Sequence, residues 1–441
     1  MKTLIQHATV VNEGEQFEAS LLLHNGIIER IERNATIEDS DATVIEAKGL
    51  FLLPGAIDDH VHMRDPGLTH KATFETETSA AAAGGVTSVM DMPNVIPQTT
   101  SLKLIEERYK AAEGRCRVNY AFYLGATSDN IEDILHADTP NIPGVKLFMG
   151  SSTGNMLVDN EQGLRRIFRE CPTILMTHCE SSERINKRTK EVQKEFGEDP
   201  CIIHHPEIRD EEACYQSTAL AVQLAKESGT RLHVAHLSTA RELELFTTEK
   251  PHITAEACVP HLIFTQDDYH TLGTRIKCNP SIKREEDRDA LRQALNDGRI
   301  SLIATDHAPH LLREKQGGCV KAVSGMPMIQ FSLPAMLTLA DEGILSIERV
   351  VELMCHAPAR VFGIKQRGFI REGYKADLVL VRPTLHTITD QEVKSICGWT
   401  PLNGKTLNWS VEHTWVNGQL AWDGKEVNAS AWGEALEFER H

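Results

Sequence analysis

Two histidines and an arginine occupy alternate positions in the stretch GAIDDHVHMRDPG, residues 55–67. In a β-strand, side chains two residues apart point to the same face, so His60, His62 and Arg64 would be directed at one place. Imidazole nitrogens are ligands for metal ions such as Zn²⁺, and a guanidinium binds anions. The stretch therefore predicts a metal site with an anion site beside it.

Other polar residues follow apolar, strand-like runs, each at the point where its run ends. They are Asn94, Lys146, His178, His236 and Asp306. If the runs are strands of one barrel, their carboxyl ends meet at one mouth and these side chains share one pocket. Four histidines and an aspartate exceed the ligands of a single tetrahedral catalytic zinc, which favours two metal ions. The alternative is a polar mouth whose histidines are satisfied by hydrogen bonds.

Lys146 lies inside the apolar run PGVKLFMG. Burying an ammonium group is costly and lowers its pKa. A neutral amine can add CO₂ to become a carbamate, a carboxylate on a long arm that suits the bridging of two metals. From the residues alone, a snorkelling or ion-paired lysine is the simpler interpretation.

The elements that position these residues form a regular alternation. Eight strand-like runs cover residues 55–63, 87–93, 118–126, 144–149, 173–180, 231–238, 253–260 and 300–308. Helical patterns separate most of them, and several end on glycine. The alternation predicts an α/β fold, a (β/α)₈ TIM-type barrel over residues 54–363. Short β patterns before and after it predict a small β-sandwich domain composed of residues 1–53 and 364–441.

The composition excludes several classes of protein. The chain has 441 residues, 41% of them apolar, and a formal net charge of -17. An acidic chain argues against nucleic acid or an anionic membrane as the main partner, because both attract basic patches. No apolar run approaches the length of a membrane span, and the N-terminus lacks the features of a signal peptide. Ten cysteines without regular spacing indicate reduced thiols, so a cytoplasmic protein is expected.

These motifs together resemble the amidohydrolase superfamily and, within it, the dihydroorotase family. The resemblance runs from LLPGAIDDHVHMRDPG to GYKADLVLV, which is nearly the whole chain. It implies two Zn²⁺ ions per subunit and an N6-carboxylated Lys146, which reverses the interpretation made from the residues alone. The implied metal ligands are His60, His62, Lys146, His178, His236 and Asp306.

The resemblance also implies a set of substrate contacts. They are Arg64 after the HxH pair, Asn94 in MPN, Asn279 in KCNPSIK, His310 in TDHAPH, and Ser324 and Gly325 in AVSGMP. The planar guanidinium of Arg64 would bind a carboxylate with two hydrogen bonds. Arg64 could instead be an ordinary salt-bridge partner, and the two asparagines, which adjoin prolines, could be turn formers.

The implied reaction is the reversible hydrolysis of (S)-dihydroorotate to N-carbamoyl-L-aspartate in de novo pyrimidine (UMP) biosynthesis. A hydroxide bridging the metals would attack the ring carbonyl, and Asp306 would act as general base and then general acid. The partner is thus a small molecule, and a homodimer is among the expected assemblies. Two alternatives stay open: an allantoinase- or hydantoinase-type enzyme, and an inactive dihydroorotase-like scaffold.

Two further segments carry minor expectations. The stretch GSSTGNMLVD, residues 150–159, is rich in small residues and is expected to be a lid or a surface turn. His204 and His205 fall in a loop before a helical pattern and are expected not to be metal ligands.

Overall fold

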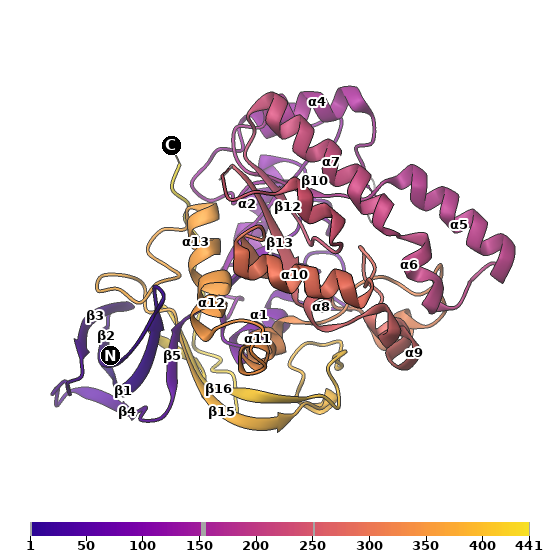
Figure 1. Cartoon of the computed structure of the whole chain (residues 1–441). Coiled ribbons are helices and arrows are strands. Elements are labelled where there is room, and N and C mark those ends of the chain that lie inside the picture. Colours follow the sequence, from indigo (N-terminus) through magenta and orange to yellow (C-terminus); the bar gives the residue numbers. More distant parts are fainter. Residues whose placement is uncertain (1, 151–155, 250–251, 441) are drawn as a thin grey trace.

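The computed structural model describes residues 2–150, 156–249 and 252–440 of the chain (Figure 1). Its central element is a barrel of parallel strands. These are β6 (Ala56–Val61), β7 (Val86–Asp91), β8 (Asn119–Phe122), β9 (Leu124–Gly125), β10 (Val145–Phe148), β11 (Leu175–His178), β12 (Leu232–Val234), β13 (Ile253–Cys258) and β14 (Leu302–Ala304). β8 and β9 are two parts of one strand, so the eight predicted runs are all present. The predicted barrel is confirmed.

The barrel closes between its first and last strands. Hydrogen bonds link the strands in the orders β6-β7-β8 and β9-β10-β11-β12-β13-β14. Beyond the end of β14, the backbone N–H of His62 donates to the carbonyl of His307 at 2.8 Å. The Asp58 carboxylate accepts the Thr305 N–H at 3.1 Å and also its hydroxyl. β6 and β14 share few main-chain hydrogen bonds, and the buried side chain of Asp58 on β6 adds two more to Thr305. These bonds hold the neighbouring Asp306 beside His60 and His62.

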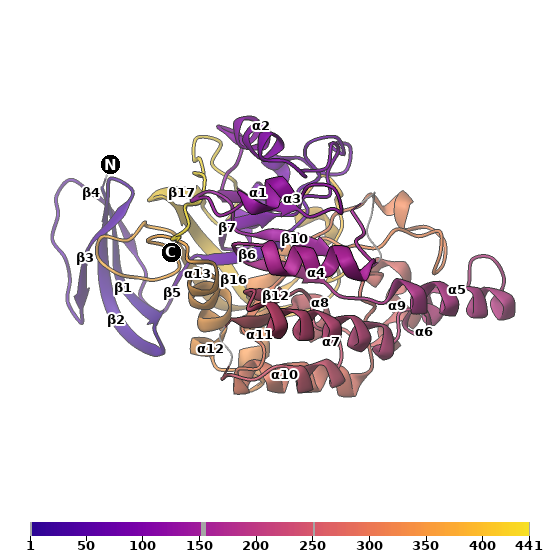
Figure 2. The same ribbon diagram turned by 90° about the horizontal axis from the view of Figure 1, so that it is seen from above.

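Helices surround the barrel (Figures 1 and 2). They are α1 (Phe74–Ala83), α2 (Leu102–Ala112), α3 (Ile131–Leu135), α4 (Glu161–Glu170), α5 (Ser182–Phe196), α6 (His205–Ile208), α7 (Glu211–Ser228), α8 (Val259–Ile263), α9 (Tyr269–Leu272), α10 (Glu285–Asp297), α11 (Ser332–Asp341), α12 (Ile347–Val351) and α13 (Ala357–Phe362). Local signals set several ends. Thr73 and Thr76 form a capping box at α1, and α7 begins at the N-cap Asp210 and ends at Gly229 in the left-handed conformation.

The two ends of the chain meet in one eight-stranded sheet. Its strands are β1 (Lys2–Asn12), β2 (Glu15–His24), β3 (Ile27–Arg33), β4 (Ala42–Glu46), β5 (Phe51–Pro54), β15 (Leu378–Thr387), β16 (Thr406–Val416) and β17 (Gln419–Trp422). β5 pairs with both β1 and β15, which joins the N-terminal and C-terminal segments. The composite β domain is therefore confirmed as a feature of the fold, and its boundaries at residues 53/54 and 363/364 stay a prediction.

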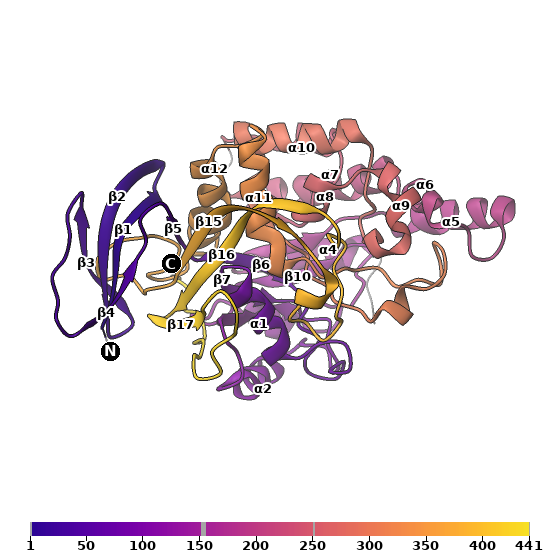
Figure 3. The same ribbon diagram turned by 90° about the horizontal axis from the view of Figure 1, so that it is seen from below.

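The C-terminal segment also supports the barrel. Figure 3 shows the long strands β15 and β16 running beneath the barrel beside α11. Trp409 of β16 donates its indole N–H to Asp341 at 2.9 Å. Leu436 and Phe438 pack in the same buried cluster as the inward-facing barrel residues Met90 and Met176. Because apolar side chains fill this part of the barrel interior, the polar groups lie at the carboxyl ends of the strands.

Candidate active site

The site residues expected from the sequence come together in one cavity. It has a volume of about 410 Å³ and lies at the carboxyl ends of the barrel strands. Its walls include His60, His62, Arg64, Asn94, Lys146, His178, His236, Asn279, Asp306, His310, Ser324 and Gly325. Their shared location agrees with the sequence analysis, and the individual roles stay predictions.

The HxH pair faces Asp306. The Nε2 atoms of His60 and His62 lie 3.4 and 3.1 Å from the same Asp306 oxygen, Oδ1. Both histidines come from the end of β6, and Asp306 follows β14, so barrel closure brings the three together. Ligand atoms of these residues all lie within 4.8 Å of one another, which is the spacing that one metal ion requires.

The other two histidines form a second pair. His178 is the last residue of β11, and His236 lies two residues past β12. The Nδ1 atom of His178 is 2.9 Å from the Nε2 atom of His236, and the His236 ring centroid is 5.3 Å from that of His60. Two ring nitrogens at this separation, both buried, are arranged to share a cation or a single proton.

Lys146 of β10 is 1% exposed, and its ammonium nitrogen has no hydrogen-bond partner within the described ranges. The nitrogen lies 5.4 Å from the ring centroid of Phe148. Burial lowers the pKa of the Lys146 amine below its ordinary value. A buried amine without a counter-ion is a costly feature that carboxylation and metal binding would relieve.

Each of three site histidines has its second ring nitrogen held by an oxygen outside the cluster. His60 Nδ1 is 2.5 Å from Glu256, His62 Nδ1 is 2.8 Å from Oδ1 of Asn94, and His178 Nε2 is 2.9 Å from Glu180. Metal-binding histidines in proteins are oriented in this way, because a held N–H fixes both the tautomer and the ring direction. The donor set therefore fits a metal centre. Asn94, which the sequence indicated only as a substrate contact, therefore also orients the ring of His62.

The electrostatics keep His62, His236 and Asp306 in metal-binding form near neutral pH. Burial lowers the pKa of His62 to about 4 and that of His236 well below its ordinary value. Burial alone would raise the pKa of Asp306, but the imidazoles of His60 and His62 outweigh it and hold the pKa below its usual range. Neutral imidazoles around an ionised carboxylate are the states in which these residues bind a cation.

The backbone is strained at three site residues. Arg64, His236 and Asp306 have φ angles of 63°, 39° and 47°, in the left-handed region that side chains other than glycine rarely adopt. Each such residue costs on the order of 1–3 kcal/mol. Because all three lie within three residues of the end of a barrel strand, the strained turns direct their side chains into the cavity.

The anion side of the cavity is formed around Arg64. Its guanidinium donates to the carbonyl of Pro309 at 3.3 Å, and Nη2 lies 3.0 Å from Nε2 of His310. Within the described residues, no carboxylate is within 4.0 Å of this buried cation, so the salt-bridge alternative is not supported. Lys71, which the sequence analysis did not single out, also lines this wall.

The far wall is a loop held by the buried Lys315. Ser324 donates to Oδ1 of Asn279 at 3.0 Å. Lys315 donates to the carbonyls of Lys277, Val323 and Gly325 at 2.6–3.0 Å. These bonds position the loop at its two predicted substrate contacts, Ser324 and Gly325.

Gly325 has a φ of 124°, and a Cβ there would lie 2.8 Å from the carbonyl of Ala308 and 3.0 Å from His310. Only glycine fits this close approach.

Other residues also line the cavity. Arg209 and Lys277 were not singled out in the sequence, and His205 was expected only to be a non-ligand. His205 Nε2 lies 3.0 Å from the carbonyl of Cys278, and the neighbouring His204 stacks on Phe196. Neither histidine belongs to the ligand cluster, although their expected absence from the metal ligands stays a prediction. Half of the segment 150–159, residues 151–155, lies outside those described.

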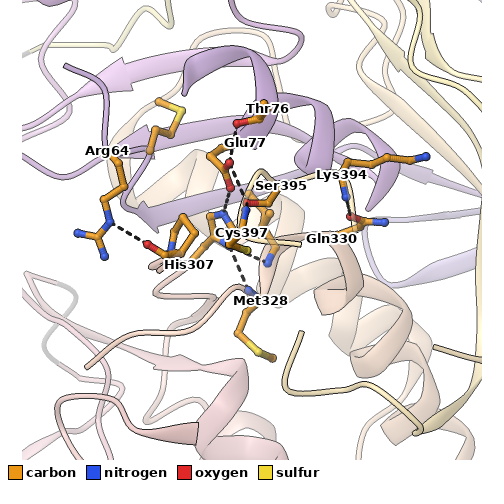
Figure 4. A network of polar contacts seen from close by, with 12 residues as sticks. Arg64, Thr76, Glu77, His307, Met328, Gln330, Lys394, Ser395 and Cys397 are labelled. Atoms are coloured by element: carbon orange, nitrogen blue, oxygen red, sulfur yellow. Dashed lines mark hydrogen bonds and ion pairs between the residues drawn. The ribbon is translucent and has the colours of Figure 1, made fainter. Parts of the chain in front are cut away.

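A polar network behind the site fixes Asp306 from outside (Figure 4). Glu77 of α1 lies 2.7 Å from Nε2 of His307, the residue after Asp306, and accepts the hydroxyl of Ser395 at 2.9 Å. His307 Nδ1 accepts the N–H of Met328 at 3.0 Å. Residues from three distant parts of the chain thereby hold the turn that presents Asp306.

Two other expectations concern the whole chain. Each of the ten cysteines is a free thiol. None of the helices in the described ranges is long and apolar enough to cross a membrane.

Comparison with known proteins places this geometry among hydrolases. The amidohydrolase family model matches residues 51–421. The dihydroorotase of Halobacterium salinarum is 34% identical over 91% of this chain and 93% of its own. An allantoinase of Salmonella choleraesuis is 28% identical over 95% of both chains. The solved structure of an L-hydantoinase (dihydropyrimidinase) from Arthrobacter aurescens has a TM-score of 0.91 at 28% identity and covers 97% of both chains.

Proposed function

The chain belongs to the amidohydrolase family and is a cyclic amidohydrolase, and from this premise we propose that it is a dihydroorotase. The proposed reaction is the reversible hydrolysis of (S)-dihydroorotate to N-carbamoyl-L-aspartate. In the cell this step would form the ring in pyrimidine synthesis, carried out in the cytoplasm by a homodimer.

One observation carries the choice of substrate. Arg64 is a buried cation that lines the cavity without a carboxylate partner among the described residues. A buried charge is stable only when it is paired. Dihydroorotate supplies the missing carboxylate, whereas the ring substrates that give allantoinases and hydantoinases their names do not carry one on the ring.

The residues present fit a pair of metal ions. His60, His62, Lys146 in carboxylated form, His178, His236 and Asp306 would hold two Zn²⁺ ions. When bound, such a metal pair lowers the pKa of a coordinated water and polarises a carbonyl group.

The chain's own groups would divide the remaining work. Asp306 faces His60 and His62 and would accept a proton from the attacking water and pass it to the leaving ring nitrogen. Arg64 and His310 would donate to the substrate carboxylate. Asn94, Asn279, Ser324 and Gly325 would orient the ring, because correct placement of the reacting atoms is itself a large part of catalysis.

The test is turnover by the purified, zinc-loaded protein. We would measure hydrolysis of dihydroorotate and cyclisation of N-carbamoyl-L-aspartate, with allantoin, hydantoin and dihydrouracil as controls. Turnover confined to the carboxylate-bearing pair supports the proposal. Turnover of a control alone retains the amidohydrolase chemistry and rejects this substrate. A protein that binds zinc and turns over nothing would be the inactive scaffold.

A further inference from the structure

His310 lies between two cations. Its Nε2 is 3.0 Å from Nη2 of Arg64, and its Nδ1 is 3.1 Å from Nζ of Lys71. Arginine and lysine can only donate hydrogen bonds, whereas a neutral imidazole carries one N–H and one lone pair. One of the two contacts must therefore place a donor against a donor.

The ring stays neutral in this position. Burial lowers the pKa of His310 well below its usual range, and the charges of Arg64 and Lys71 lower it further. The other ionisable groups that act on the ring are Lys315, His62 and Glu314, whose carboxylate lies 3.9 Å from Nδ1. A neutral ring has two tautomers, and which of them forms decides the nitrogen that can donate to a ligand.

Lys71 is the better fixed of the two cations. Its ammonium is 2.9 Å from one oxygen of Glu314, whose other oxygen accepts the N–H of Leu311 at 2.8 Å. The backbone of His310 is also fixed, because its carbonyl accepts the indole N–H of Trp399 at 2.7 Å. Arg64 has no such carboxylate among the described residues.

We propose that Lys71 sets the tautomer of His310: its ammonium donates to Nδ1, which leaves the proton on Nε2. The Nε2–H and the Nη2 of Arg64 then form two converging donors, and a carboxylate oxygen placed between them relieves their mutual repulsion. This inference rests on the proposed function for the identity of that carboxylate. Lys71 is thereby a positioning residue that favours a carboxylate-bearing ring over an uncharged one, for which the converging donors would stay without an acceptor.

The tautomer is measurable without turnover. ¹⁵N NMR of the zinc-loaded protein labelled in histidine distinguishes a protonated ring nitrogen from one with a free lone pair, and the His310 signals are assigned by their loss in His310→Gln. We expect a lone-pair nitrogen at Nδ1 and a protonated one at Nε2 in the native chain. A proton on Nδ1 would overturn the proposal, whatever the enzyme's substrate.

Kinetics supply the second readout. Lys71→Met should raise KM for dihydroorotate about 10–100-fold, change kcat much less, and alter the His310 NMR signals. Lys71→Gln retains an N–H donor and should recover most of the loss. Lys103→Met, which removes an 83% exposed lysine that does not line the cavity, is the matched control. Native KM and unchanged NMR signals in Lys71→Met would contradict the proposal. Failure of the native enzyme to act on dihydroorotate would instead refute the proposed function and leave the tautomer result standing.

Discussion

Nδ1 of His60 lies 2.5 Å from Oε1 of Glu256. This contact joins the end of β6, the first barrel strand, to β13 on the other side of the barrel closure. The same carboxylate oxygen accepts the backbone N–H of His236 at 3.1 Å. Glu256 therefore orients two of the proposed ligands from different strands.

Glu256→Gln should weaken metal binding about 10–100-fold, the usual effect of losing the partner of a ligating histidine. The measurement is a zinc competition titration against a chelator. The matched control is Glu242→Gln, a buried glutamate that accepts from Thr218 and Thr239 and contacts no proposed ligand. Equal zinc affinity in Glu256→Gln and the native protein would show that Glu256 does not tune the site.

Arg64→Gln should lower kcat/KM for dihydroorotate by about 100–1,000-fold, because a buried charge-assisted contact to the substrate is lost. That ratio corresponds to roughly 3–4 kcal/mol. The measurement is steady-state kinetics in both directions. Arg117→Gln, which removes an arginine that stacks on Trp432 outside the cavity, is the control. Undiminished activity in Arg64→Gln would remove the carboxylate site from this position.

Asp306→Asn should retain most of the metal and lose turnover in both directions by about 10²–10⁴-fold, the range that general acid–base catalysis supplies. The amide keeps an oxygen near His60 and His62 but cannot take up a proton. Metal content by atomic spectroscopy and turnover are measured on the same sample. Full activity would exclude Asp306 from proton transfer.

Lys146→Ala should lose the paired metal centre, because the proposed bridging group is gone. Formate or acetate, added in excess, should partly restore metal binding and turnover by standing in for the carbamate. The native enzyme treated with the same acids is the control and should not gain activity. An alanine variant that is fully metallated and active without added acid would refute carboxylation of Lys146.

The free energy of unfolding should fall as the pH is lowered, in part through His261. Burial lowers the pKa of His261 to about 4 in the folded protein, whereas the unfolded value is about 6.5. Between these values only the unfolded chain takes up the proton, so stability present above about pH 6.5 is lost toward pH 4, with a limit of roughly 3 kcal/mol for one such group.

His261→Gln should reduce this loss while keeping a donor for the carbonyl of Pro280, which lies 3.1 Å from His261 Nε2. Urea midpoints of the metal-free protein between about pH 7 and pH 5 measure the effect. His270→Gln, at an exposed position, should follow the native protein. The same pH dependence in His261→Gln and the native chain would contradict the assignment.

Much of the site could be predicted because it depends on local rules. Strand alternation aligns His60 with His62, and the convergence of barrel strands gathers residues at or just past strand ends, such as His178 and Asp306. These rules need only residue order and type. The sequence by itself therefore determined the barrel, the composite β domain and the predicted site residues that share the cavity, but not wall residues such as Lys71 and Arg209.

The tertiary structure alone decided which groups pair. Glu256 reaches His60, and Lys71 reaches His310, across 196 and 239 residues of chain. Such pairs depend on barrel closure and on turns such as the left-handed one at Arg64, where φ is 63°. No local pattern encodes either, because a hydrogen-bond partner is selected by position in space and a strained turn is maintained only by the packing around it.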